Sequence, residues 1–159
     1  MKKKYWHYWR KLMDKVISEI ADEEKVARIL FSPSHVYKGQ VSPKAFKLEK
    51  LKSGAEDYIS VLRYNADQLD SVSAVFQPRT KGDSRYGYTF LNARDVRNLD
   101  YEFSNRKVEL LPKPNKRLPL HAGIFLSIDG RLQTADDVSP DIDFFQKELA
   151  MLCDGVHKF

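Results

Sequence analysis

The sequence predicts one α+β domain over residues 1–159, in which amphipathic helices at the N and C termini bracket a five- or six-stranded antiparallel or mixed sheet. A length of 159 residues is common for a single domain. Hydrophobic residues make up 42% and charged residues 31%, which is too apolar for a disordered chain. Apolar residues recur at helical spacing near both ends, and segments rich in β-branched and aromatic residues lie between them, so the helices should flank the strands.

The N-terminal helix is predicted over residues 5–22. Its apolar side chains recur at alternating spacings of three and four residues, as on one face of a helix: Trp6, Trp9, Met13, Val16 and Ile20. Polar residues occupy the opposite face. This helix should pack against the sheet, against the C-terminal helix or across a homodimer.

Six extended segments follow, each rich in β-branched or aromatic residues: 26–31, 41–48, 58–64, 86–92, 101–111 and 118–128. Pro43 interrupts the second of these and places it at a sheet edge or bulge. A short helix is predicted over 65–72, and a helical turn over 93–99.

The C-terminal helix has the clearest start signal. Ser139 can cap it, Pro140 suits its first position, and Asp141 and Asp143 complement the positive end of its dipole. Its apolar residues then repeat at helical spacing: Ile142, Phe145, Leu149, Leu152 and Val156.

The charge distribution and the cysteine content indicate which partners and which cellular compartment to expect. The net charge is +5, with 13 Lys/Arg against 6 Asp/Glu in residues 1–52 and 3 against 7 in residues 118–159. Such asymmetry allows attraction between the two ends or a basic surface for an acidic partner. Cys153 is the only cysteine, so no internal disulfide is possible and a reducing cytoplasm is expected. No secretion signal and no transmembrane run are predicted.

The sequence lacks the motifs of nucleotide-binding folds, zinc proteases, α/β-hydrolases and CxxC redox proteins, and we expect no metal and no cofactor. One catalytic hypothesis remains. If Arg28 and Arg63 share a sheet face with His121, two guanidinium groups and an imidazole would converge as at a phosphodiester site. The alternative is a histidine in the core or packed across strands and two arginines in surface ion pairs.

Two further segments combine cations with aromatic rings. The loop at 79–88 carries Arg79, Lys81, Arg85 and Tyr86, which could hold phosphate or stack a base, or could belong to a solvated hairpin loop. At the N terminus, Trp6 and Trp9 lie among lysines and an arginine, as on surfaces that bind nucleic acid or anionic membranes. The same tryptophans also fit packing in the core or at a subunit interface.

Several segments between residues 26 and 126 share a pattern. They are the arginine strand 28–31, the V-S-P-K-A-F segment at 41–46, the I-S-V strand at 59–61 and the H-A-G-I strand at 121–124. This pattern resembles one in small uncharacterised bacterial proteins. The resemblance implies a bacterial cytosolic protein and draws attention to Arg28, Ser60 and His121, but implies no activity.

Two functional interpretations follow. The first is a small bacterial cytosolic binding or accessory protein that acts through a protein or nucleic-acid partner. The second is a metal-independent enzyme that cleaves RNA or transfers nucleotides, with His121 as acid or base and Arg28 and Arg63 stabilising negative charge. The positions of these three side chains would discriminate between them.

Overall fold

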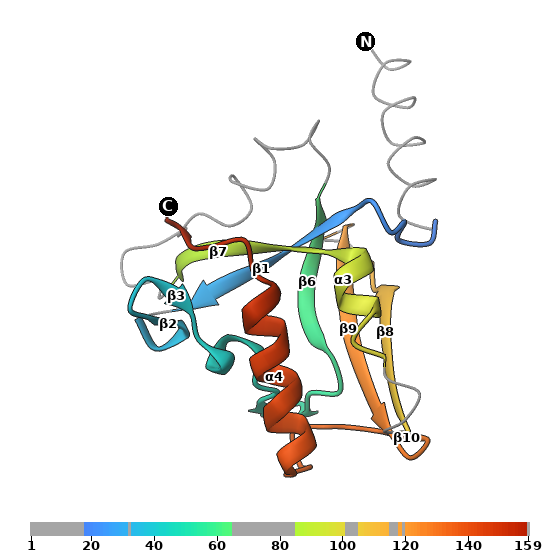
Figure 1. Cartoon of the computed structure of the whole chain (residues 1–159). Coiled ribbons are helices and arrows are strands. Elements are labelled where there is room, and N and C mark those ends of the chain that lie inside the picture. The colour runs from blue at the N-terminus through green and yellow to red at the C-terminus, as the bar shows by residue number, and fades with distance from the viewer. Residues whose placement is uncertain are drawn as a thin grey trace.

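The computed structural model describes residues 18–31, 33–64, 85–100, 105–114, 118 and 120–158. Its main element is a seven-stranded antiparallel sheet. Five strands lie in the order β9-β6-β1-β7-β11, while β8 pairs with β9 on the side away from β6, and β10 pairs with the end of β9 (Figure 1). The strands are β1 (Lys25–Phe31), β6 (Ile59–Tyr64), β7 (Arg85–Asn92), β8 (Arg106–Pro112), β9 (His121–Ile128), β10 (Arg131–Leu132) and β11 (His157–Lys158).

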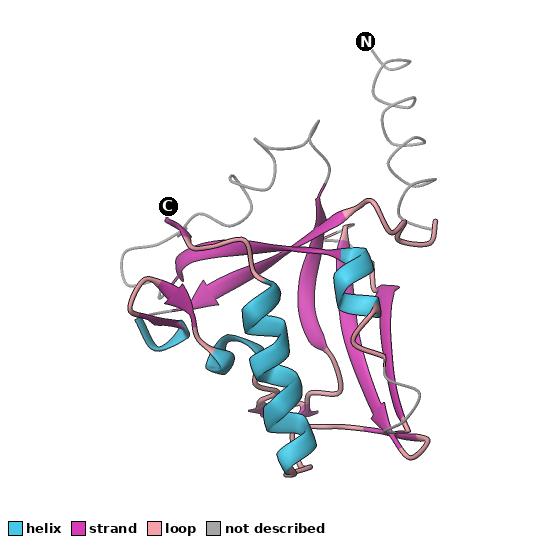
Figure 2. Cartoon of the chain, viewed as in Figure 1, coloured by secondary structure: helices cyan, strands magenta, loops and turns pink. Residues whose placement is uncertain are grey.

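Shorter elements fill the connections. Two small ribbons pair β2 (Val36–Tyr37) with β3 (Gln40–Val41), and β4 (Lys50–Leu51) with β5 (Gly54–Ala55). The helical elements are η1 (Pro33–His35), η2 (Pro43–Phe46), α3 (Ala93–Arg97) and α4 (Pro140–Leu152). Figure 2 shows α4 lying across one face of the sheet, with α3 beside the ends of the neighbouring strands.

The prediction of a sheet bracketed by two terminal helices is wrong. The described chain is mostly β-sheet, and α4 is its one helix of seven or more residues. Residues 1–17 lie outside the described residues, and residues 18–22, where the predicted N-terminal helix would end, are not helical. Ile20 is buried in the core there without belonging to a helix, because the hydrophobic effect rewards burial of its side chain in any backbone conformation.

Most predicted strands are present, but the segment 41–48 is not one. Ser42 accepts a hydrogen bond from the Lys44 N–H and Pro43 occupies the first turn, so a 3₁₀ helix begins here. Proline fits this position since its ring fixes φ and the missing N–H would have no helical partner. The predicted helix over 65–72 lies outside the described residues.

The C-terminal helix is confirmed at its predicted start. The Ser139 side chain accepts from the Ile142 N–H at 3.2 Å, and Pro140 follows at the first position. Phe145 and Leu149 are buried against the sheet and η2, while Phe144 is exposed. The amphipathic spacing therefore identified the helix and its buried side, although Val156, the last residue of the predicted repeat, lies beyond the end of the helix at Leu152.

The two faces of the sheet differ in what packs on them. Alternate residues of a strand point to opposite faces. On the covered face, side chains from five strands join a single core cluster with α3, α4 and η2: Val26, Leu30, Ile59, Val61, Leu91, Val108, Leu110, Ala122, Ile124 and Leu126. On the other face, a second cluster forms around Ala27 and Leu62, with tyrosine and phenylalanine rings at its edge. We call this second side the aromatic face.

No helix in the described part of the chain is long and apolar enough to cross a membrane.

Candidate functional site

The sheet separates the three residues of the catalytic hypothesis. Arg28 lies between Val26 and Leu30 in β1, and Arg63 follows Val61 at the same parity in β6, so both arginines point to the covered face. His121 pairs directly with Leu62 and shares the aromatic face with it. The imidazole and the two guanidinium groups therefore do not converge on one substrate.

Arg63 anchors the segment that enters the sheet. It is 2% exposed, and its guanidinium donates to the Glu24 carboxylate at 2.9 Å and to the Ser18 carbonyl at 2.9 Å. The Glu24 carboxylate matches the charge of the buried guanidinium, and both of its terminal nitrogens have acceptors. These contacts hold residues 18–24 against β6.

Arg28 holds η2 against the sheet. Its Nε donates to the Ala45 carbonyl at 2.9 Å and its Nη1 to the Ser60 carbonyl at 2.8 Å. Burial lowers the pKa of Arg28 from its ordinary value, while the charges of Glu56 and Glu49 oppose this shift. The described contacts of Arg28 thus link backbone segments to one another.

His35 is a neighbour of Arg28 that the sequence did not indicate. Its Nδ1 accepts from the Phe31 N–H at 3.1 Å. Burial, and then the positive charge of Arg28, lower the pKa of His35, and Glu49 opposes them. The imidazole is therefore held neutral in the fold.

The predicted binding residues are described only in part. Trp6, Trp9, Arg79 and Lys81 lie outside the described residues, and Arg85 is described only as backbone in β7. Tyr86 follows Arg85, at an irregularity in the pairing of β7 with β1, and Lys158 Nζ lies 5.3 Å from the centroid of its ring.

Cys153 offers no nucleophile at neutral pH. Its thiol donates to the Leu149 carbonyl at 3.4 Å, and burial raises its pKa to about 12. Among the described residues, no three His, Cys, Asp or Glu side chains gather as they would around a metal ion.

The aromatic face carries two ring clusters. The first, the β9 cluster, consists of Tyr58, His121 and Phe125 with Lys113. The Tyr58 ring centroid lies 5.2 Å from that of Phe125 and 5.8 Å from that of His121. Lys113 Nζ lies 5.4 Å from the Tyr58 centroid and 5.8 Å from that of Phe125, which are cation–π distances. His121 Nδ1 donates to the Lys113 carbonyl at 2.9 Å and ties this cation to β9.

Gly123 makes room for the β9 cluster. A Cβ at this position would lie 2.7 Å from Tyr58 and 2.9 Å from Phe125, closer than real contacts allow. The missing side chain lets both rings lie over the backbone of β9.

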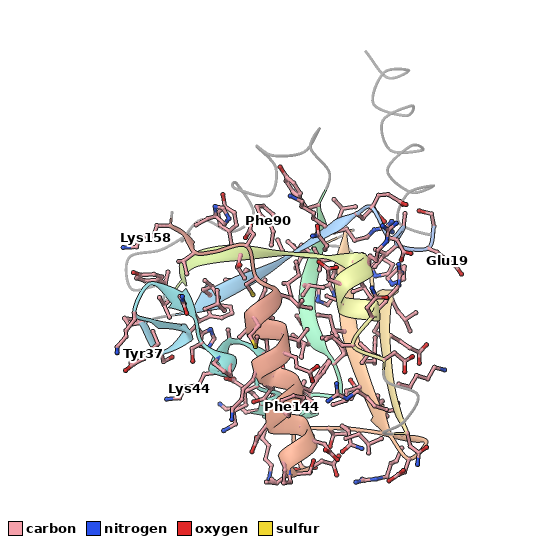
Figure 3. All side chains as sticks on the ribbon, in the orientation of Figure 1. Glu19, Tyr37, Lys44, Phe90, Phe144 and Lys158 are labelled. Carbon is pink, nitrogen blue, oxygen red and sulfur yellow. The ribbon has the colours of Figure 1, made fainter. Side chains whose placement is uncertain are left out.

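The second group, the β7 cluster, consists of Tyr64, Tyr88, Phe90 and His157. Phe90 lies 4.5 Å from Tyr64 and 5.4 Å from Tyr88, and the Tyr88 and His157 rings stack at 5.2 Å. Figure 3 shows Phe90 and Lys158 on the side of β7 away from α4. β7 and β9 are three strand spacings apart, or about 14 Å at about 4.8 Å each, so the two clusters span the sheet.

The sequence contained a signal for this face that our interpretation of individual motifs missed. Aromatic residues recur at even spacings in three segments: Tyr58 and Tyr64 are six residues apart, Tyr88 and Phe90 two, and His121 and Phe125 four. The positions of opposite parity include Ile59, Val61 and Ile124, so both faces of the sheet carry large rings or aliphatic side chains. A sheet with one solvated polar face would instead alternate apolar and polar residues.

The chain matches no protein-family model, no curated protein and no solved structure. The resemblance of residues 26–126 to bacterial proteins stays an expectation.

Proposed function

We propose that the chain is a binding protein for single-stranded nucleic acid, which it holds on the aromatic face of the sheet. The observation that supports this most directly is the β9 cluster, where Lys113 lies over the rings of Tyr58 and Phe125. Single-strand binding combines rings on which bases stack with cations that contact the phosphates. The β9 cluster supplies both, from Phe125 on β9, Tyr58 directly before β6 and Lys113 directly after β8.

The charges around the rings favour an anionic ligand. Lys25, Lys107, Lys113 and Lys158 are exposed, and they lie on β1, on β8, directly after β8 and on the edge strand β11, respectively. Glu109 and Asp154 are the carboxylates beside them, and each has a cationic or histidine partner within 3.5 Å. The chain as a whole carries +5. Phosphate binding through these lysines would be weak in sequence preference, since phosphate contacts do not distinguish bases.

The test compares matched pairs of variants in the full chain. Binding of labelled oligo-dT, oligo-rU and a duplex is measured by fluorescence anisotropy at several salt concentrations. Phe125→Leu keeps an apolar side chain but removes a stacking ring, which is worth about 1–3 kcal/mol per base, or roughly 5- to 150-fold in Kd. Phe144→Leu makes the same change on α4, away from the aromatic face, and should leave Kd unchanged.

A second pair tests the phosphate contacts. Lys113→Ala should reduce the slope of log Kd against log salt by about 0.7, the value for one phosphate contact to a single strand. Lys147→Ala removes an exposed lysine on α4 and should leave the slope unchanged.

Failure of the wild-type chain to bind either single strand at low salt would refute the proposal. Equal affinities of the Phe125 and Phe144 variants would also refute it, since binding would then occur elsewhere.

A further inference from the structure

A groove runs along the free edge of β8. β8 pairs with β9 from Arg106↔Ile128 to Pro112↔Ala122 and with no other described strand. The ladder is bounded by hydrogen bonds from Asp129 N to Asn105 O at 3.0 Å and from Lys113 N to His121 O at 2.8 Å. In an antiparallel pair, alternate residues exchange both backbone bonds with the partner strand. The odd-numbered residues 105–113 are therefore the bonded ones.

The even-numbered residues of β8 direct their backbone groups away from β9. For Val108 and Leu110, neither the N–H nor the C=O has a hydrogen-bond partner in the described chain. Their side chains are buried in the core, at 5% and 2% exposed, so this part of β8 is held rigidly. A rigid strand with unpaired donors and acceptors is a template for another strand.

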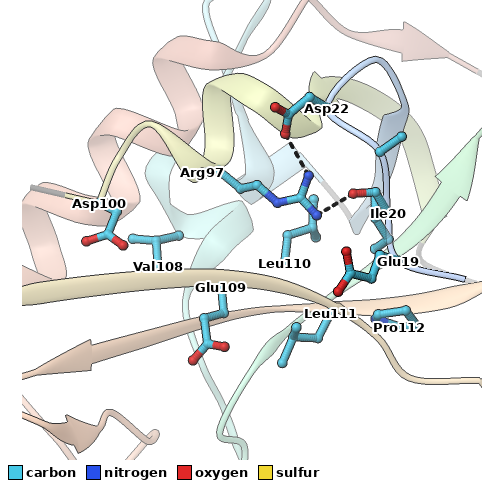
Figure 4. A pocket seen from close by; sticks show the side chains of 11 residues that line it. Glu19, Ile20, Asp22, Arg97, Asp100, Val108, Glu109, Leu110, Leu111 and Pro112 are labelled. Atoms are coloured by element: carbon cyan, nitrogen blue, oxygen red, sulfur yellow. Dashed lines mark hydrogen bonds and ion pairs between the residues drawn. The ribbon is translucent and has the colours of Figure 1, made fainter.

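The groove lies directly beside these groups. It has a volume of about 570 Å³ and is lined by residues 108–112 of β8 on one side and by residues 19–22, Arg97 and Asp100 on the other. Figure 4 shows Asp22, Ile20 and Arg97 facing Val108 and Pro112 across it. Residues 108–112 extend over about 14 Å at about 3.4 Å per residue, enough to pair with a short extended segment.

The groove is acidic. Four acidic residues line it, Glu19, Asp22, Asp100 and Glu109, against Arg97 as the single basic residue. Arg97 already donates to Asp22 at 2.8 Å and to the Ile20 carbonyl. Glu19 and Asp100 are exposed, and no cation in the described chain pairs with their carboxylates. A ligand with positive charge would complement this rim.

We propose that this groove binds a lysine- or arginine-containing extended segment of a partner protein, which adds to the sheet as a strand beside β8. Strand addition supplies main-chain hydrogen bonds for affinity and side-chain contacts for specificity. The backbone groups of Val108 and Leu110 are available for the main-chain hydrogen bonds. The carboxylates of Glu19 and Asp100 are available for contacts with basic side chains. This surface is separate from the aromatic face, so the proposal does not depend on nucleic-acid binding.

The walls of the groove favour a single strand over a second copy of this protein. Residues 19–22 and Arg97 stand across from β8, so the edge of another complete sheet would meet them. Two copies joined edge to edge would also bring two acidic rims together, which is unfavourable. An isolated basic segment avoids both problems.

The probe is a labelled hexapeptide of alternating valine and lysine, used with the full chain. Two forms are methylated on the backbone nitrogens, one at the valines and one at the lysines. Because alternate N–H groups of an added strand face β8, one methylated form should bind at least about tenfold more weakly than the other. A valine–glutamate hexapeptide should not bind. Equal binding of the two methylated forms would mean attraction by charge alone and would overturn strand addition.

Amide hydrogen exchange provides a readout at single residues. In the free protein, the Val108 and Leu110 amides should exchange quickly, while the Lys107 and Glu109 amides, which bond to β9, should be protected. The valine–lysine peptide should slow exchange at Val108 and Leu110 alone. Protection of these two amides without peptide would show that the edge is already paired, and would overturn the proposal.

Charge variants complete the test. The double variant Glu19→Gln/Asp100→Asn should weaken binding of the valine–lysine peptide about three- to tenfold, as expected for two partly exposed ion pairs. Asp136→Asn, which changes an exposed carboxylate in the loop before α4, should not. Unchanged affinity in the double variant, or no binding of the valine–lysine peptide at all, would refute the assignment of this groove.

Discussion

The two faces of the sheet use cations in different ways. On the covered face, Arg28, Arg63 and Arg106 donate to backbone carbonyls or to carboxylates. These contacts link η2, residues 18–24 and α4 to the strands. On the aromatic face, Lys113 lies over the rings of Tyr58 and Phe125 and remains exposed. A buried guanidinium needs several acceptors in fixed positions, whereas a lysine can extend its ammonium group into water.

This difference shows why an arginine within an apolar strand is weak evidence for a catalytic site. Each arginine on the covered face satisfies a structural need that arises where two layers meet. The exposed lysines beside rings have no comparable role in the core. The faces should therefore respond differently to mutation, with stability changing on one and binding on the other.

The largest expected contrast concerns phenylalanines. Phe145→Ala removes a side chain that is 1% exposed and should lower the free energy of unfolding by about 3–5 kcal/mol. Phe125→Ala, on the aromatic face, should lower it by less than about 2 kcal/mol, because part of that ring already faces water. Urea denaturation measures both values.

A control lies next to Phe145 in the same helix. Phe144 is 56% exposed, so Phe144→Ala should change the free energy of unfolding by less than about 0.5 kcal/mol. If Phe125→Ala were as destabilising as Phe145→Ala, the two faces would not differ, and the aromatic face would be a second core.

The next contrast concerns the ion pair beneath α4. Arg106 donates to Glu148 at 2.8 Å, and both side chains are nearly buried. Glu148→Leu leaves the guanidinium with the Leu99 carbonyl and should destabilise the fold by about 3 kcal/mol. The double variant Arg106→Met/Glu148→Leu should regain most of this loss, since it removes the uncompensated charge.

Removal of a single charge should not destabilise the fold on the aromatic face. Lys113→Met exposes no buried partner and should leave stability within about 0.5 kcal/mol of the wild type. No recovery of stability in the Arg106/Glu148 double variant would argue that this pair contributes more than charge compensation.

The smallest effect concerns pH and His35. Its pKa is lowered in the fold, so the unfolded chain binds a proton more readily below its ordinary value of 6.5. The stabilisation of the fold that comes from neutral His35 is fully present above pH 6.5, and it is lost as pH falls through the lowered pKa. Thermal melts at pH 7.5 and 5.0 should show a smaller decrease in Tm for His35→Gln than for the wild type. An equal decrease would place the acid sensitivity elsewhere.

The sequence predicted individual elements better than their arrangement. The strands around Val26, Ile59 and Tyr88, and the helix that begins at Pro140, were identified because local propensity, capping and burial agree there. Segment 41–48 was misassigned because its β-propensity competes with the N-cap of Ser42 and the fixed φ of Pro43.

The candidate sites depend on strand register, which a single sequence does not specify. The face of the sheet on which each of Arg28, Arg63 and His121 lies follows only from pairings such as Val26↔Arg63 and Leu62↔His121. A shift of one residue would have moved a whole strand to the other face. The groove beside β8 could not be predicted from the sequence either, since the residues that line it, 19–22 and 108–112, are far apart in the chain.

Gly123 has a consequence for how this sequence can vary. Its backbone is ordinary strand, so no turn requires glycine there, and the restriction comes from the rings of Tyr58 and Phe125 above it. Homologous chains that keep both rings should tolerate only glycine at this position. Where a larger residue has replaced it, one of the two rings should have become smaller in the same lineage, so that the three positions evolve together.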